Sequence, residues 1–255
     1  MEKYDPIKIN KYTTIIQDYL NNCYACFKEF THVAMGENFY GKFMLDKHQI
    51  KEFTKLYSEA VQCGVIFSIA ENPKDYGPLL IDIDLEISLE NHNNERLYND
   101  DMICEVINTY RNVSSKYLNL IAEELAASVF EKPKPSEKKN IIKDGVHIIF
   151  HNITAHYKLR YLIRNDVVNI LNNSEHFKQF SNSVAKIIDK AVINNNCWLL
   201  PGSRKKDGQL YELKYIYNQN NESFNIQNLL SDKYKMINLY SLQHKIRHEK
   251  IQLNI

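Results

Sequence analysis

The sequence predicts a mixed α+β protein built around antiparallel or mixed sheet. Apolar and acidic residues alternate strictly through residues 79–86, which is the period-2 pattern of a β-strand. Other stretches, such as 10–28 and 100–130, repeat apolar residues at helical spacing. The predicted strands and helices intermingle without a regular βαβ succession or an internal repeat, which favours α+β over a doubly wound parallel sheet.

Five helices are predicted from the spacing of apolar residues. Asp46 precedes the second of them and is suited to cap it, because an aspartate side chain accepts hydrogen bonds from the first free backbone amides of a helix. The longest pattern begins near residue 100, after a polar loop. The predicted helices are 10–28, the helix that follows Asp46 as far as Val61, 100–130, 155–172 and 232–248.

Six strands are predicted from short runs of apolar and β-branched residues. Residues 71–78, with Asn, Gly and two prolines, read as the turn that leads into the acidic strand. Residues 132–139 form a basic, proline-containing connector that is expected to be mobile. The predicted strands are 31–35, 41–45, 65–69, 79–87, 145–150 and 211–217.

Composition indicates a globular intracellular protein. Of the 255 residues, 44% are hydrophobic and 25% are charged, and seven glycines and six prolines leave little room for flexible linkers. No apolar run is long enough to span a bilayer, and the first residues do not resemble a secretion signal. We therefore expect a soluble protein that has no membrane partner.

The net charge of +1 conceals two oppositely charged halves. Residues 1–127 carry a net charge of −8 and residues 128–255 a net charge of +9. This division suits a protein that holds cations with one part and phosphates with another. Charge complementarity between the halves would explain it equally well.

The five cysteines do not form a disulfide framework, because their number is odd and their spacing irregular. Cys23 and Cys26 have the CxxC spacing of zinc ligands, but no second CxxC or paired histidine follows. Both lie on an apolar helical face. Reduced thiols in the core are therefore the favoured interpretation, with a metal at this pair left open.

The acidic strand is the strongest candidate for a functional site. Asp82 and Asp84 leave the same face of the predicted strand, and Glu86 follows one step further on. Adjacent carboxylates repel each other unless a cation lies between them, and hard oxygen ligands of this kind suit Mg²⁺ or Mn²⁺. A solvated strand edge is the alternative interpretation.

Three further motifs bear on this strand. His147 lies in a predicted strand, where a single histidine is more often structural, and Gly145 just before it would let a ligand approach closely. Asp189 ends an apolar run, where a capping role is the usual one. The turn Gly202-Ser203-Arg204-Lys205-Lys206 offers backbone amides and cations to a triphosphate, although a solvated basic loop would look the same.

In this order, the motifs resemble those of the archaeo-eukaryotic primase superfamily: an Asp-x-Asp/Glu strand, a small-x-His strand and a hydrophobic-Asp motif. Here these are Asp82-Ile-Asp84, Gly145-Val-His147 and Ile188-Asp189. The sequence is most similar to the primase part of the helicase-primases of nucleocytoplasmic large DNA viruses, and 189–205 is also similar to PrimPol. The resemblance spans roughly residues 31–217. Pro201 and Gly202 depart from it, because PrimPol has bulkier residues there.

The resemblance implies a fold, a reaction and a set of roles. The fold would be the archaeo-eukaryotic primase fold: an RRM-like catalytic module, roughly 76–220, plus an N-terminal α/β module, roughly 1–75 with later returns, in one domain over 1–255. The reaction would be nucleotidyl transfer, in which a 3′-hydroxyl attacks the α-phosphate of a nucleoside triphosphate and pyrophosphate leaves. Two Mg²⁺ or Mn²⁺ ions would bind Asp82, Asp84 and Asp189, and His147 would contact the phosphates.

The remaining expectations concern the triphosphate and the partners. Ser203, Arg204 and Lys205 are candidates for the β- and γ-phosphates, with Lys143 and Gly145 as further candidates. Single-stranded DNA would be the template, a helicase ATPase would be fused C-terminally, and the protein would act at a viral replication site in the host cytoplasm. A metal-dependent nuclease or phosphatase, and a non-catalytic single-stranded DNA-binding module, are the alternatives.

Overall fold

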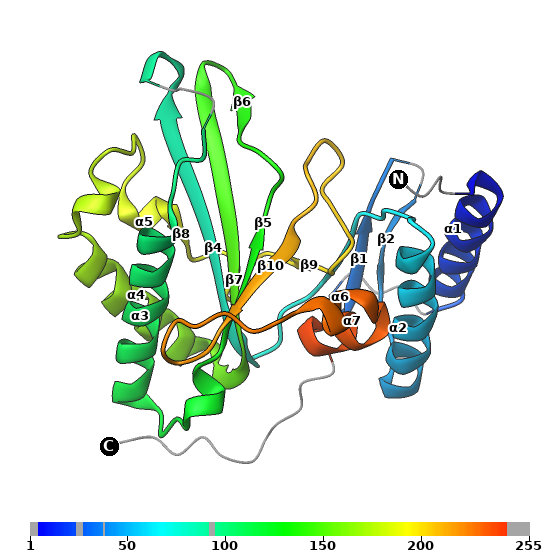
Figure 1. Cartoon of the computed structure of the whole chain (residues 1–255). Helices are drawn as coiled ribbons and strands as arrows, with labels where there is room; N and C mark the ends of the chain where they lie inside the picture. The colour runs from blue at the N-terminus through cyan, green and yellow to red at the C-terminus, as the bar shows by residue number, and fades with distance from the viewer. Residues whose placement is uncertain (1–4, 24–27, 38, 92–94, 244–255) are drawn as a thin grey trace. The chain divides into compact units, whose positions relative to one another are not determined.

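A computed structural model describes residues 5–23, 28–37, 39–91 and 95–243, and the chain divides into two units (Figure 1). Unit 1 comprises the described residues of Met1–Lys74, Asn196–Tyr211 and Asn225–Ile246. Unit 2 comprises those of Asp75–Asn195 and Glu212–Phe224. Within the parts described, no helix is both long and apolar enough to cross a membrane.

Unit 1 is a four-stranded antiparallel sheet with the order β2-β1-β3-β9 and with packed helices. Asp46 caps α2 in a capping box, accepting from the backbone amides of His48 and Gln49 while the Gln49 side chain accepts from the Asp46 amide. The elements are α1 (Pro6–Asn21), β1 (His32–Met35), β2 (Tyr40–Phe43), α2 (Lys47–Gln62), β3 (Ile69–Glu71), β9 (Trp198–Leu199), α6 (Gln227–Ser231) and α7 (Lys233–Tyr240).

A buried polar network ties the segment after α7 to the sheet of unit 1. The Glu71 carboxylate is 2% exposed and lies 3.3 Å from Nε2 of His32. It also accepts hydrogen bonds from the Ser241 hydroxyl at 2.6 Å and from the Leu242 amide at 2.5 Å. Three polar groups from two distant parts of the chain thus share one buried carboxylate.

We expect Glu71→Ala to lower the free energy of unfolding by about 3 kcal/mol, because removal of the buried carboxylate leaves the buried polar groups that contact it without that partner. Urea denaturation followed by circular dichroism measures the change. Glu37→Ala is the control, since Glu37 pairs with Lys206 at the surface, where such pairs contribute at most about 1 kcal/mol. Equal losses in the two variants would show that the Glu71 network contributes nothing beyond a surface pair.

Unit 2 is built on a sheet with the order β10-β5-β7-β4-β8, and β6 pairs with β7 to one side of this path. Every described strand pair in it is antiparallel. The elements are β4 (Tyr76–Ser88), η1 (Leu89–Asn91), α3 (Asp100–Tyr117), η2 (Ala122–Leu125), β5 (Ala127–Glu131), β6 (Ser136–Lys138), β7 (Ile141–His156), α4 (Tyr157–Leu171), η3 (Glu175–Phe177), α5 (Val184–Ile187), β8 (Ile188–Asp189) and β10 (Glu212–Tyr217).

The alternation in β4 separates a core face from a polar face. Ile81, Ile83 and Leu85 are 0% exposed and belong to one hydrophobic cluster with residues of α3 and α4. These two helices pack along one face of the sheet (Figure 1). The side chains between the apolar ones in β4 therefore point away from the helices.

The predicted mixed α+β architecture is confirmed, and several predicted bounds are wrong. Residues 127–131 form the strand β5 rather than the end of the 100–130 helix, which stops at Tyr117. The connector at 132–139 contains β6, which pairs with β7. The strand predicted at 65–69 is assigned only from Ile69, as β3, although Phe67 forms an isolated bridge with Ser203.

Candidate metal centre

The site is built across three neighbouring strands of unit 2. Because β4 lies between β7 and β8, Asp82 has a cross-strand neighbour on each side: His147 of β7 and Asp189 of β8. Asp84 faces Gly145 of β7 in the same register. Directly opposed residues of antiparallel strands project to the same face, so all five positions share the face that points away from α3 and α4.

The three predicted carboxylates come together as one cluster. Each of Asp82, Asp84 and Asp189 offers an oxygen, and these oxygens all lie within 4.8 Å of one another. Asp84 is exposed, and the other two are half-buried. Asp189 also accepts a hydrogen bond from the Ala191 amide at 2.9 Å, which fixes the orientation of its side chain.

His147 lies at the edge of this cluster. Its Nε2 is 3.4 Å from Oδ1 of Asp82, and the two side chains are 13% and 14% exposed. On its other side the cross-strand neighbour is Phe130 of β5, which is buried. The imidazole therefore lies between an apolar ring and a carboxylate in the same cross-strand row.

The backbone beneath the cluster is anchored by the core. Ile83, Val146 and Ile188, which lie next to the site residues in sequence, are all 0% exposed. They form a cross-strand row on the helix-covered face. Because neighbouring residues of a strand alternate between faces, burial of this row directs the carboxylates to the opposite face.

Asn182 supports the acidic strand and was not identified from the sequence. Its side-chain nitrogen donates to the Asp84 carbonyl at 2.8 Å, and its oxygen accepts from the Glu86 amide at 3.2 Å. The Asn182 side chain thus forms hydrogen bonds with two backbone groups at the edge of β4, as a peptide group of a neighbouring strand would. An isolated asparagine in a polar loop gives no sequence signal of this contact.

The remaining predicted residues of β4 and β7 form an ion pair. Lys143 faces Glu86 across the two strands, and its ammonium contacts the Glu86 carboxylate. Glu86 does not belong to the acidic cluster formed by the described residues. Gly145 is buried and contributes no side chain beside Asp84.

Ser203, Arg204 and Lys205 lie in unit 1 rather than in the unit that carries the acidic cluster. The Ser203 hydroxyl is 2% exposed, lies 2.8 Å from the Tyr57 hydroxyl and accepts from the Ile69 amide at 3.1 Å. Its contacts are those of a structural residue. Arg204 and Lys205 are exposed, so their charges are available to a ligand.

The turn before these residues requires glycine. Gly202 has a φ of +89°, and a Cβ atom at this position would lie 2.8 Å from Val61 of α2. The amides of Ser203 and Arg204 already donate to the carbonyls of Leu200 and Phe67, at 2.9 Å each. The glycine therefore serves close packing on α2, and these two amides are engaged within unit 1.

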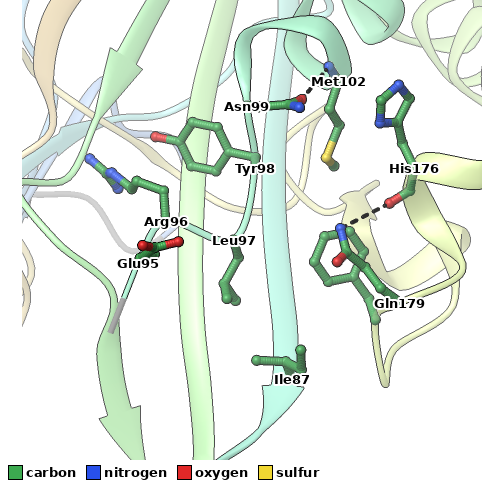
Figure 2. A pocket seen from close by; sticks show the side chains of 10 residues that line it. Ile87, Glu95, Arg96, Leu97, Tyr98, Asn99, Met102, His176 and Gln179 are labelled. Carbon is green, nitrogen blue, oxygen red and sulfur yellow. Dashed lines mark hydrogen bonds between the residues drawn. The ribbon is translucent and has the colours of Figure 1, made fainter. Parts of the chain in front are cut away.

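Figure 2 shows a pocket in unit 2, with a volume of about 450 Å³. None of the three carboxylates of the acidic site lines it. One of its lining residues is Ile87, which has the orientation of Ile81 and Ile83 and therefore lies on the helix-covered face of β4. Two polar groups in its lining have structural contacts: Asn99 caps α3, and Gln179 donates to the His176 carbonyl. The pocket is lined by Ile87, Glu95, Arg96, Leu97, Tyr98, Asn99, Met102, His176, Gln179 and Phe180.

The cysteines provide no second metal cluster among the residues that the structure describes. Cys23 is buried and reduced, and burial raises the pKa of its thiol. Cys26 lies outside the described residues, so the question of a metal at the Cys23–Cys26 pair stays open. Cys63, Cys104 and Cys197 are also free thiols.

The residues present fit a divalent cation. Three carboxylate oxygens within 4.8 Å of one another repel each other, and a cation between them removes that repulsion. An all-oxygen donor set is the kind that Mg²⁺ and Mn²⁺ prefer, rather than the sulfur and nitrogen donors typical of structural zinc.

The fold and the site agree with the archaeo-eukaryotic primase class that the sequence motifs resemble: an antiparallel sheet carries the Asp-x-Asp strand between the His strand and the second Asp strand. The family model of the C962R protein N-terminal archaeo-eukaryotic primase domain matches residues 31–217. The match covers most of the chain, and the chain belongs to this family.

Relatives are large viral proteins. The chain is 29% identical over 195 residues to a provisionally named helicase, L207/L206, of Acanthamoeba polyphaga mimivirus, with 76% of this chain and 20% of the relative covered. It is also 29% identical over 227 residues to a provisionally named helicase, 184R, of Invertebrate iridescent virus 6, with 78% and 22% covered. The chain thus spans about a fifth of the length of these two relatives.

Proposed function

We propose that the chain is the primase or primase-polymerase domain of a viral replication protein and makes primers by template-directed nucleotidyl transfer. The observation that carries the proposal is the row in which Asp82 has Asp189 on one side and His147 on the other, with Asp84 beside them on the same face. This arrangement supports the proposal because it would offer carboxylates to cations and a hydrogen-bond donor to phosphate within one sheet.

The resemblance to the primase family suggests a role for each site residue, and the positions of these residues are compatible with those roles. Asp82, Asp84 and Asp189 would hold the divalent ions, Mg²⁺ or Mn²⁺. Bound there, the ions would lower the pKa of the attacking 3′-hydroxyl and neutralise the charge that develops on the triphosphate. His147 would donate a hydrogen bond to the phosphates from the edge of the cluster, and Gly145 would leave room for the nucleotide beside Asp84.

The phosphate-binding cations are proposed to be Arg204 and Lys205, whose side chains are exposed. Ser203 is less suited, because its hydroxyl is buried and bonded within unit 1. Lys143 is less suited too, because its ammonium pairs with Glu86. The basic second half of the sequence would bind the single-stranded DNA template.

We also propose that this primase domain works together with a helicase ATPase in one polypeptide. The relatives carry helicase names, and the chain matches only about a fifth to a quarter of their lengths. A primase joined to a helicase would act on the single strand as it is exposed, because tethering raises the effective concentration of the template.

A single assay tests the proposed reaction against its alternatives. The protein is incubated with a single-stranded template, labelled nucleotides and Mn²⁺ or Mg²⁺. We expect labelled products that are complementary to the template and that disappear when chelator is added. Degradation of the template would instead indicate a nuclease, and retention of the template without product would indicate a binding module; either result would overturn the proposal.

A further inference from the structure

Arg164 is a buried arginine whose guanidinium contacts the backbone next to the site and, through Nη1, also Oδ1 of Asn165 at 3.1 Å. It projects from α4, is 7% exposed, and directs its guanidinium at the chain just before Asp189. Nε donates to the Ile188 carbonyl at 3.0 Å, and Nη2 donates to the same oxygen at 2.6 Å. Nη2 also contacts the Ala185 carbonyl, in α5.

These hydrogen bonds act on the peptide group that carries Asp189. The carbonyl of Ile188 and the amide of Asp189 belong to the same planar peptide unit, so fixing the oxygen fixes the plane from which Asp189 begins. Hydrogen bonds from a charged donor are stronger than neutral ones, and two of them converge on this oxygen. These contacts thus restrain the backbone from which the Asp189 side chain projects, whereas the Ala191 amide contacts the carboxylate itself.

The strand that carries Asp189 has little support of its own. β8 consists of only Ile188 and Asp189, and its sheet pairing is limited to Ile83 and Asp82 of β4. The preceding helix α5 has four residues, too few to be stable without tertiary contacts. A site that needs a carboxylate at a defined position therefore requires an additional contact here.

We propose that Arg164 is a positioning residue for the metal centre, which holds the Ile188–Asp189 peptide so that the Asp189 carboxylate meets those of Asp82 and Asp84. The inference rests on the proposed metal-binding function of these three residues. It assigns a role to a residue that touches neither the nucleotide nor the ions.

Arg160 offers a matched comparison on the same helix. It lies one turn before Arg164, is 3% exposed, and also donates to a backbone carbonyl, that of Pro78 at 3.3 Å. Burial lowers the pKa of its guanidinium to about 10. Arg160 Nη2 also donates to the Asp75 carbonyl at 3.5 Å. Pro78 and Asp75 both precede the acidic cluster in sequence, so Arg160 contacts no peptide group next to Asp82, Asp84 or Asp189.

The test compares Arg164→Lys with Arg160→Lys. The affinity for Mn²⁺ is measured by electron paramagnetic resonance of the free ion, and stability is measured by urea denaturation. We expect both variants to be less stable than the wild type. We expect only Arg164→Lys to weaken Mn²⁺ binding, by about tenfold or more, as is usual when a residue that orients a metal ligand is changed.

A second variant and a second measurement keep the test decisive. Arg164→Gln retains one donor and replaces the lysine variant if that variant does not fold. Hydrogen exchange of residues 184–192 is expected to be faster in the Arg164 variant and unchanged in Arg160→Lys. Wild-type Mn²⁺ affinity in the Arg164 variant would overturn the inference, whatever its exchange rate.

The variant Asp189→Asn distinguishes a wrong positioning role for Arg164 from a wrong assignment of the metal centre. If Asp189→Asn loses Mn²⁺ binding while the Arg164 variant keeps it, only the positioning role is wrong. If the wild type binds Mn²⁺ no better than Asp189→Asn does, the metal centre itself is wrong and the proposed function falls with it.

Discussion

Changing Asp82, Asp84 or Asp189 to Ala is expected to abolish nucleotide incorporation. A site for two ions loses the geometry of both when a shared ligand is removed. At a Mn²⁺ concentration of one hundred times Kd, the wild type is expected to gain about 2.7 kcal/mol of stability by mass action, and each variant much less. Primer extension and thermal unfolding with and without Mn²⁺ measure both effects.

The controls separate a metal ligand from a structural carboxylate. Without metal, Asp82→Ala and Asp84→Ala are expected to be as stable as the wild type or slightly more stable, because they relieve repulsion within the cluster. Asp189→Ala also loses the hydrogen bond from the Ala191 amide, so Asp189→Asn, which keeps that acceptor, is the better variant there. Asp101→Ala, in the exposed first turn of α3, is the matched control and should keep both the Mn²⁺ shift and activity.

An undiminished Mn²⁺ shift and normal primer extension in Asp189→Ala would show that the third motif is not part of the centre. A loss of stability comparable to that of a lost cap, about 1 kcal/mol, with activity merely reduced, would instead identify a structural role.

The relative positions of Asp82 and Asp84 could be predicted because they depend only on the pattern of a few neighbouring residues. A strict alternation places Asp82 and Asp84 on one face of a strand, and the structure has them there. The meeting of Asp189 with Asp82 could not be derived from spacing, because it depends on a two-residue strand pairing with a strand far away in sequence. Only the ordered resemblance to a family supplied that contact.

The errors in the element bounds have a common physical cause. Val129 and Phe130 follow Leu125 at helical spacing and so extend the helical pattern of the sequence. In the structure they belong to β5, which pairs with β7 on one side and with β10 on the other. These two ladders outweigh the local pattern, which is ambiguous for short apolar runs. Likewise β6 exists because β7 extends back to Ile141 and offers it an edge.

The supporting residues could not be assigned from sequence because their partners are backbone atoms. Arg160 and Arg164 recur at helical spacing within the apolar stripe of α4, which indicates buried arginines that need acceptors. The acceptors are carbonyls of β4 and of the segment before Asp189, and no residue type marks a carbonyl. The sequence thus indicates that both arginines need hydrogen-bond acceptors, but it does not identify those acceptors.

His147→Ala is expected to lower nucleotide incorporation by about 10²–10³-fold, the usual cost of removing one positioned hydrogen-bond donor from a site that binds developing charge. His147 has Phe130 and Asp82 as its cross-strand neighbours, and its imidazole does not extend the carboxylate cluster. The Mn²⁺-induced gain in stability should therefore survive the change. Single-turnover extension assays and thermal unfolding with Mn²⁺ measure the two quantities on the same preparation.

Two further variants decide what His147 does. His147→Gln retains a donor and should recover part of the lost rate, whereas His156→Ala, at the end of the same strand, should leave the rate unchanged and lower stability modestly, because His156 caps α4. Loss of the Mn²⁺ shift in His147→Ala would make the histidine a metal ligand instead. Full activity of His147→Ala would show that His147 is not part of the functional site. Its ring, 3.4 Å from Asp82, would then contribute only to the packing of the sheet.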